Sequence, residues 1–105
     1  MPPSLSNRAR AHLRGLAHHL DPVVTVGAAG LTDGVARAIT VALEDHELIK
    51  VQLPKGLAPA ERAALAERIA AATDSALIHR IGRRIVLYRA RQRNDRSRPR
   101  IELPG

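Results

Sequence analysis

The segment from Val23 to Gly34 restricts the fold more than any other part of the chain. A short apolar and β-branched run leads directly into Gly-Ala-Ala-Gly at residues 27–30. Thr32 and Asp33 then open a stretch in which apolar residues recur at helical spacing. This order predicts a strand, a tight glycine loop and a helix N-terminus, where exposed backbone N–H groups favour an anionic ligand. The alternative is that the glycines only turn the chain between strand and helix.

The rest of the chain alternates in the same way. Ser6 is the predicted N-cap of a first helix, which continues to about His19 and ends before Asp21-Pro22. The other predicted elements are a strand over 23–26, a helix over 33–45 capped by Thr32, a strand over 47–53, a helix over 59–73 with Pro59 at its first position, and strands over 76–81 and 84–88. Gly82-Arg83 predicts a type II′ hairpin turn. The order α-β-α-β-α-β-β favours a two-layer α/β domain with one mixed four-stranded sheet.

Periodicity also predicts the buried faces. The expected buried positions are Leu5, Ala9, Leu13, Leu16 and Leu20 in the first helix, Val35, Ala38, Ile39, Ala42, Leu43 and His46 in the second, and Leu65, Ile69 and Ala72 in the third. The strand over 47–53 alternates and is expected to be covered on the face of Ile49, Val51 and Leu53. Gly15 costs helix propensity, and we interpret it as a point of close packing.

The charge balance favours a nucleic-acid partner. Seventeen Lys and Arg face ten Asp and Glu, which gives a net charge of +7, and most of the cations are Arg. Arginine presents a planar fork of donors that matches phosphate oxygens. The excess is uneven, since the chain from Arg89 onward is rich in Arg and holds only Asp95 and Glu102 as acids. A basic tail alone does not define a specific site.

Three regions supply candidate RNA contacts. The first helix carries a basic row without an acidic partner in the helix, the glycine loop offers backbone donors, and the hairpin tip carries further arginines flanked by Arg80 and Arg89. The candidate residues are Arg8, Arg10, Arg14 and His18 in the helix, Gly27, Ala28, Ala29 and Gly30 in the loop, and Arg83 and Arg84 at the tip. Tyr88 is the only aromatic residue besides the histidines, which excludes a platform of Phe, Tyr or Trp rings for stacking bases. We therefore expect RNA contacts through backbone, phosphate and shape.

Catalytic and metal sites are not predicted. The serines have no evident partner, the carboxylates are scattered, and His12, His18, His19 and His46 lack the spacing of a helical zinc site. The chain contains no cysteine and no apolar run long enough for a membrane helix. We expect a cytoplasmic, non-catalytic protein without cofactor, metal or small-molecule substrate.

Several segments together resemble one known family. They are residues 13–18 (Leu-Arg-Gly-Leu-Ala-His), 22–24, 26–35, 46–51 and 81–89, followed by Ile-Glu-Leu-Pro at 101–104. In this order they resemble the CRM domain of chloroplast RNA-splicing and ribosome-maturation proteins, and in particular its bacterial single-domain, YhbY-like members. The resemblance implies a fold similar to the C-terminal domain of translation initiation factor three.

The resemblance further implies an RNA-binding protein associated with ribosomal RNA in precursors of the large ribosomal subunit. The family's GxxG loop maps onto residues 27–30, and its basic first helix onto Arg10, Arg14 and His18. Relatives often carry a polar or basic residue between the two glycines, whereas this chain has two alanines. We therefore expect the loop to contribute backbone N–H groups rather than side chains.

The expected organisation is one RNA-binding domain over residues 4–90 and a basic, mobile tail over 91–105 with a short extended piece at its end. We expect a monomer. One alternative is a protein–protein adaptor whose charge serves solubility. A double-stranded DNA binder is a further alternative, although the sequence shows no helix-turn-helix pattern.

Overall fold

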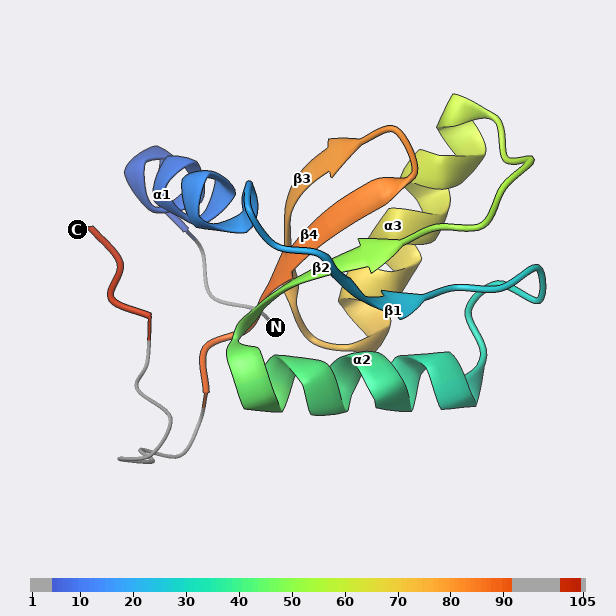
Figure 1. Ribbon diagram of the computed structural model, residues 1–105, viewed down its shortest axis with the longest axis horizontal. Coiled ribbons are helices and arrows are strands. Elements are labelled where there is room, and N and C mark those ends of the chain that lie inside the picture. The colour runs from blue at the N-terminus through green and yellow to red at the C-terminus, as the bar shows by residue number, and fades with distance from the viewer. Residues whose placement is uncertain (1–4, 92–100, 105) are drawn as a thin grey trace.

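The computed structural model describes residues 5–91 and 101–104 (Figure 1). Its elements are α1 (Asn7–Ala17), β1 (Pro22–Thr25), α2 (Asp33–His46), β2 (Leu48–Gln52), α3 (Pro59–Ala72), β3 (Ala76–Ile81) and β4 (Arg84–Tyr88). The predicted order of helices and strands is confirmed, and most boundaries agree to within one or two residues.

One mixed sheet forms the centre of the molecule, as predicted. Its strand order is β1-β2-β4-β3, with β1 parallel to β2 and the other two pairs antiparallel. Helix α2 connects the parallel strands β1 and β2, and α3 connects β2 to the β3–β4 hairpin. In this order β1 and β3 are the two edge strands. At the tip of that hairpin Gly82 has a φ of 56°, whereas Arg83 is not in the positive-φ region. The predicted type II′ turn requires this combination.

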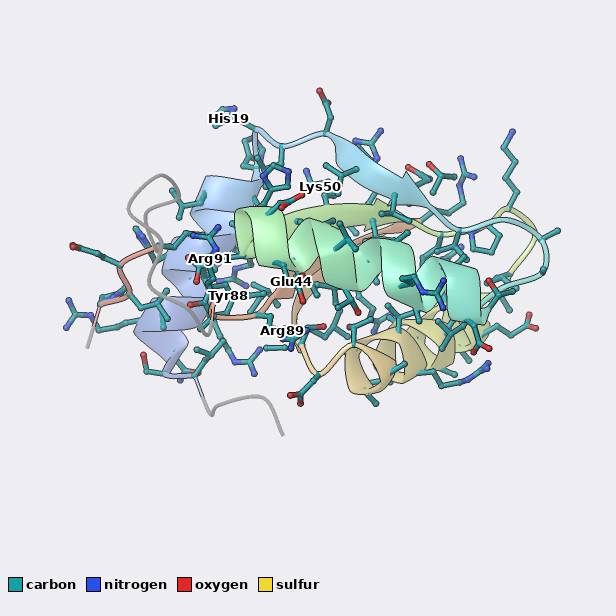
Figure 2. The ribbon with its side chains drawn as sticks, turned by 90° about the horizontal axis from the view of Figure 1, so that it is seen from below. His19, Glu44, Lys50, Tyr88, Arg89 and Arg91 are labelled. Carbon is teal, nitrogen blue, oxygen red and sulfur yellow. The ribbon has the colours of Figure 1, made fainter. Side chains whose placement is uncertain are left out.

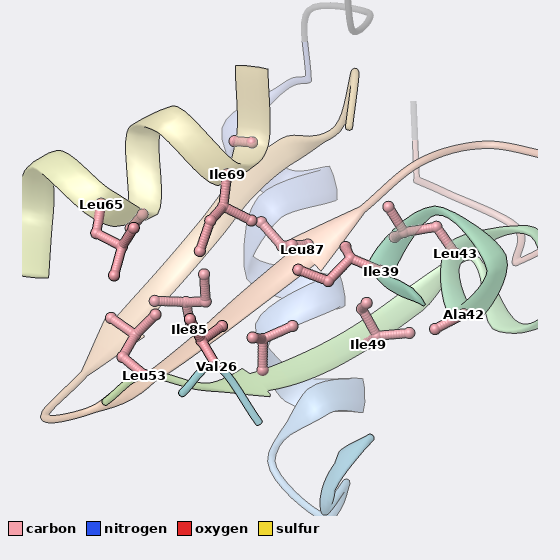
Figure 3. Packing of buried hydrophobic residues seen from close by; sticks show 13 residues of the cluster. Val26, Ile39, Ala42, Leu43, Ile49, Leu53, Leu65, Ile69, Ile85 and Leu87 are labelled. Atoms are coloured by element: carbon pink, nitrogen blue, oxygen red, sulfur yellow. The ribbon is translucent and has the colours of Figure 1, made fainter. Parts of the chain in front are cut away.

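Helices cover both faces of the sheet, so the predicted two-layer arrangement is wrong. Helices α2 and α3 pack on one face over a core that includes Ile39, Ile49, Ile69 and Leu87, while α1 lies on the far side (Figure 3). A second, smaller core beneath α1 consists of Leu13, Ala17, Leu48, Ala76, Ile78, Val86 and Tyr88. The amphipathic pattern of a helix shows that one of its faces is buried, but not against which side of a sheet.

The predicted helix starts are confirmed by their hydrogen bonds. The Ser6 hydroxyl accepts the N–H of Ala9 at 3.0 Å, and the Thr32 hydroxyl accepts the N–H of Val35 at 3.2 Å. At the start of α3, the carboxylate of Glu61 accepts the backbone N–H of Ala58 at 2.9 Å. Each contact satisfies a backbone donor that the helix itself cannot pair.

Several predicted core positions are exposed instead. They are Leu16 within α1, Leu20 beyond its end, Ala38 and His46 in α2, and Ala72 at the end of α3. The true stripe of α1 repeats every four residues through Ala9, Leu13 and Ala17, so an apolar residue one position away points to solvent. Gly15 is not a close-packing point, because a Cβ added there would meet no atom within 4 Å.

A β-bulge in β3 changes which residues share the α1 face. Leu77 pairs with Leu87, but His79 pairs with Val86, so the bulge accommodates Ile78 as an extra residue. Directly paired residues project to the same face of a sheet. His79 and Ile81 therefore join Val86 on the α1 side, which strict alternation from Ile78 would not predict.

The described C-terminal residues lie against the domain near the end of α2 (Figure 2). The buried carboxylate of Glu47 accepts the N–H groups of Arg91 at 2.5 Å and Ile101 at 2.7 Å. Ile101 and Leu103 pack against the core beneath α1. Most of the predicted mobile tail falls on residues 92–100, which lie outside the described residues.

Candidate nucleic-acid interface

A groove of about 510 Å³ opens between α1 and the sheet. Five of its lining residues carry cationic or imidazole side chains: Arg14 and His18 from α1, Lys50 from β2, His79 from β3 and Arg84 from β4. The others are Ala11, Gly15, Ala17, Ile81 and Val86. We call this set of ten residues the α1 groove.

The strand register explains why these side chains meet. Lys50 pairs with Val86, and both lie on the face that α1 covers only in part. Two residues along β2, Gln52 pairs with Arg84, which therefore projects to the same face as Val86. The bulge in β3 adds His79 to this face. Towards Leu48 and Tyr88 the same face is sealed by α1, so the groove lies where that cover ends.

The charged residues that line the α1 groove are all positive. None of the residues that line it carries a carboxylate, while Arg14, Lys50 and Arg84 each contribute a positive charge. A cleft lined by one sign of charge concentrates counter-ions, and guanidinium groups bind phosphate oxygens through paired hydrogen bonds. The floor formed by Ala17 and Val86 is apolar, so the groove can accommodate an anionic ligand that also has an apolar part.

A second cavity, of about 480 Å³, lies at the glycine loop. Its lining comprises Thr25, Val26, Gly27, Ala28, Gln52, Leu53, Pro54, Lys55 and Arg83. The loop projects from the end of β1 (Figure 1). Residues 27–29 are exposed and Gly30 is half-buried, so the loop is accessible to a ligand, as predicted.

The backbone donors of the loop are fewer than the sequence suggested. The Gly30 N–H is donated to the Gly27 carbonyl at 2.9 Å, which closes a turn, and Gly30 has a φ of 73°. At the start of α2, Thr32 caps the N–H of Val35, and Asp33 places a negative charge in the first turn. The dipole of α2 is thus already compensated by the protein's own carboxylate. What remains for an anion is the exposed tip of the turn, beside Lys55 and Arg83.

The structure does not bring the basic row of α1 to the glycine loop. Helix α1 and the loop lie towards opposite ends of the molecule in Figure 1. Arg14 and His18 line the α1 groove, whereas Arg10 donates from its guanidinium to the Leu77 carbonyl at 3.1 Å. Arg8 is exposed on α1 and lines neither cavity.

The two predicted hairpin arginines divide between the two cavities. Arg83 lines the loop cavity and Arg84 the α1 groove. Gln52, which lines the loop cavity together with Arg83, accepts the Arg84 Nε–H through its side-chain oxygen at 3.2 Å. The two cavities are therefore neighbours, and this hydrogen bond joins a residue of one lining to a residue of the other.

Sequence reasoning missed two of the five cationic or imidazole residues that line the α1 groove. In the alternating pattern of β2, Lys50 lies on the face opposite Ile49 and Val51. Once α1 is known to pack on that face, the same pattern places Lys50 beside the basic row of α1. No signal in the sequence indicates the position of His79, because the β-bulge in β3 determines to which face of the sheet its side chain projects. Within residues 5–91 and 101–104, no three His, Asp or Glu side chains gather as a metal ion would require, and none of the helices has the length and apolar character of a membrane span.

Comparison with known proteins agrees with this fold. The family model described as CRS1 / YhbY (CRM) domain matches residues 5–89. A Haemophilus influenzae protein named RNA-binding protein is 43% identical over 86 residues, which cover 82% of this chain and 86% of that protein. The Bacillus subtilis protein named Probable RNA-binding protein YqeI is 36% identical over 100 residues, with coverage of 95% and 99%.

A solved structure shows the same architecture. The solution structure of the Staphylococcus aureus protein SAV1595 matches with a TM-score of 0.79 and 36% sequence identity, and covers 96% of this chain and all of that chain. The family resemblance drawn from the sequence motifs is thus confirmed. The chain belongs to the CRS1 / YhbY (CRM) domain family.

Proposed function

We propose that this protein binds RNA and that the α1 groove is its principal phosphate-binding surface. The observation that carries the proposal is the convergence of Arg14, Lys50 and Arg84 from three elements on one cleft without a lining carboxylate. The names of the relatives, which describe RNA binding, support the same ligand. The loop cavity with Arg83 continues the path that the RNA backbone follows, through the Arg84–Gln52 contact.

We further propose that the RNA is ribosomal RNA in precursors of the large ribosomal subunit, and that the protein acts by binding alone. The family resemblance supports the ribosomal target. The names of the relatives describe binding and no reaction, which supports a non-catalytic role. A cytoplasmic location follows from that target.

Salt dependence of RNA binding tests the groove. The variant combining Arg14→Gln and Lys50→Gln removes two groove charges, and binding to a fragment of large-subunit ribosomal RNA is measured by fluorescence anisotropy at several salt concentrations. We expect weaker binding and a shallower log–log salt slope, by about 0.7–0.9 for each phosphate that the variant no longer neutralises. The matched control combines Arg37→Gln and Arg68→Gln, which remove two exposed charges from α2 and α3 on the other side of the sheet.

An unchanged affinity and slope in the groove variant would contradict the assignment of the groove. Equal losses in both variants would show that only net charge matters. Absence of RNA binding by the unmodified protein would favour the protein–protein adaptor, and tighter binding to duplex DNA than to ribosomal RNA would favour a DNA-binding protein.

A further inference from the structure

Gly15 is placed where a glycine has no structural reason to be. It lies within α1, where glycine is less favourable than alanine because it gains no packing and loses more backbone freedom on folding. Its φ is not in the positive region that requires glycine. A Cβ at this position would meet nothing within 4 Å, so no neighbouring element needs the space. The space is instead part of the α1 groove, which Gly15 lines.

The α1 groove combines an apolar interior with a cationic rim. Ala17, Ile81 and Val86 line the interior with apolar side chains, and of these Ile81 is the most accessible, with 67% of its surface exposed. The groove volume of about 510 Å³ lies within the range of about 300–1,000 Å³ that is typical of pockets for small organic groups. A continuous phosphate backbone needs the cations but gains nothing from the apolar interior.

The groove also holds flat side chains on which a base can stack. His18 and His79 line it from two different elements, and imidazole rings and guanidinium planes both serve as stacking surfaces for bases. Tyr88 cannot take this role, because it is buried beneath α1 with 3% of its surface exposed. The absence of Phe and Trp from the sequence therefore does not leave this surface without stacking partners.

We infer that the α1 groove receives the base of an unpaired nucleotide, while Arg14, Lys50 and Arg84 bind the flanking phosphates. Gly15 keeps the entrance open for that base. This inference rests on the proposed RNA-binding function and makes it specific: the preferred ligand is RNA with an unpaired nucleotide rather than an uninterrupted helix. The bases of a continuous duplex are stacked inside it and cannot enter a cleft of this kind.

Filling the groove from Gly15 tests the inference. In Gly15→Leu a side chain occupies the space that the base requires, while the helix gains a residue of higher helix propensity. The matched control is Ala38→Leu, which adds the same side chain at an exposed position of α2 on the other side of the sheet. Binding is measured by fluorescence anisotropy with two blunt RNA duplexes of the same sequence, one of which carries a single unpaired uridine.

The unmodified protein and Ala38→Leu should bind the duplex with the unpaired uridine about tenfold more tightly than the continuous duplex. Gly15→Leu should lose this preference, so that it binds the two duplexes equally, and should melt no lower than the unmodified protein. Equal binding of both duplexes by the unmodified protein would overturn the inference and leave the proposed function intact. A preference that survives in Gly15→Leu would also overturn it. Failure to bind either duplex or the ribosomal RNA fragment would overturn the inference and the proposed function together.

Discussion

Glu47 is the residue on which the C-terminal part of the structure depends most. It follows α2 with a φ of 62°, a conformation that a non-glycine residue adopts only at some cost. Its backbone N–H is donated to the Leu43 carbonyl, and its own carbonyl accepts the N–H of Arg89. The side chain is 1% exposed, and its two oxygens accept the amides of Arg91 and Ile101. One carboxylate thus holds two segments of chain that are separated in sequence.

Replacing Glu47 by Ala should destabilise the fold by about 3 kcal/mol, because two amides lose a charged acceptor in a buried place. Urea denaturation followed by circular dichroism measures this change. Glu67→Ala, at an exposed position of α3, is the control and should change the free energy of unfolding by less than about 0.5 kcal/mol. A loss in Glu47→Ala no larger than in the control would show that the carboxylate does not hold the C-terminal segment.

Two glycines should respond in opposite ways to substitution by alanine. Gly15→Ala should stabilise the protein by about 0.5–1 kcal/mol, since α1 has an ordinary helical backbone there and open space for a Cβ. Gly82→Ala should destabilise it by about 1 kcal/mol, because a φ of 56° is unfavourable for alanine. Thermal unfolding of both variants measures the difference. A destabilised Gly15→Ala would restore the close-packing interpretation that the structure replaces.

At the level of elements, local patterns predicted nearly everything that depends on neighbours in sequence. The caps at Ser6 and Thr32 and the turn at Gly82 were readable because each depends on a few adjacent residues. The side of the sheet that α1 covers was not readable, since an apolar stripe does not specify its partner. The face to which His79 projects could not be predicted for a different reason. One β-bulge reverses the alternation of a strand, and the sequence contains no clear signal for the bulge.

The end of α2 shows a contact that local patterns also could not reveal. The Arg91 guanidinium donates to the carbonyls of Glu44 at 2.9 Å and Asp45 at 2.8 Å, which are among the last in the helix (Figure 2). A cation at this position satisfies unpaired carbonyls and opposes the negative end of the helix dipole. Arg91, which the sequence assigns to the basic tail, is therefore engaged by the domain.

Arg91→Ala should lower the free energy of unfolding by about 1 kcal/mol through loss of these bonds. Chemical denaturation of the variant gives the value, and hydrogen exchange of the α2 amides should show faster opening of the last turn. The same substitution at the exposed Arg68 should leave both quantities unchanged. If Arg91→Ala behaves like Arg68→Ala, the guanidinium does not stabilise the helix end.

For the molecule as a whole, the three-layer arrangement determines which basic side chains lie together on the surface. Helix α1 covers only part of its face of the sheet, and the uncovered part becomes a cleft that collects cations from several elements. The sequence identified Arg14, His18 and Arg84 as candidates but grouped them with Arg8 and Arg10, which do not line the groove, and with the distant glycine loop (Figure 1). Spatial grouping depends on the sheet topology and on the side that α1 takes, which long-range packing determines.

An NMR titration of the ¹⁵N-labelled protein with the RNA duplex that carries one unpaired uridine shows where on this surface the ligand lies. The largest shifts of backbone amides should fall on Gly15, His18, Lys50, His79 and Arg84, with smaller shifts continuing through Gln52 to the loop at 27–30. Shifts concentrated on the outer faces of α2 and α3, with the α1 groove unchanged, would contradict the placement of RNA in the groove.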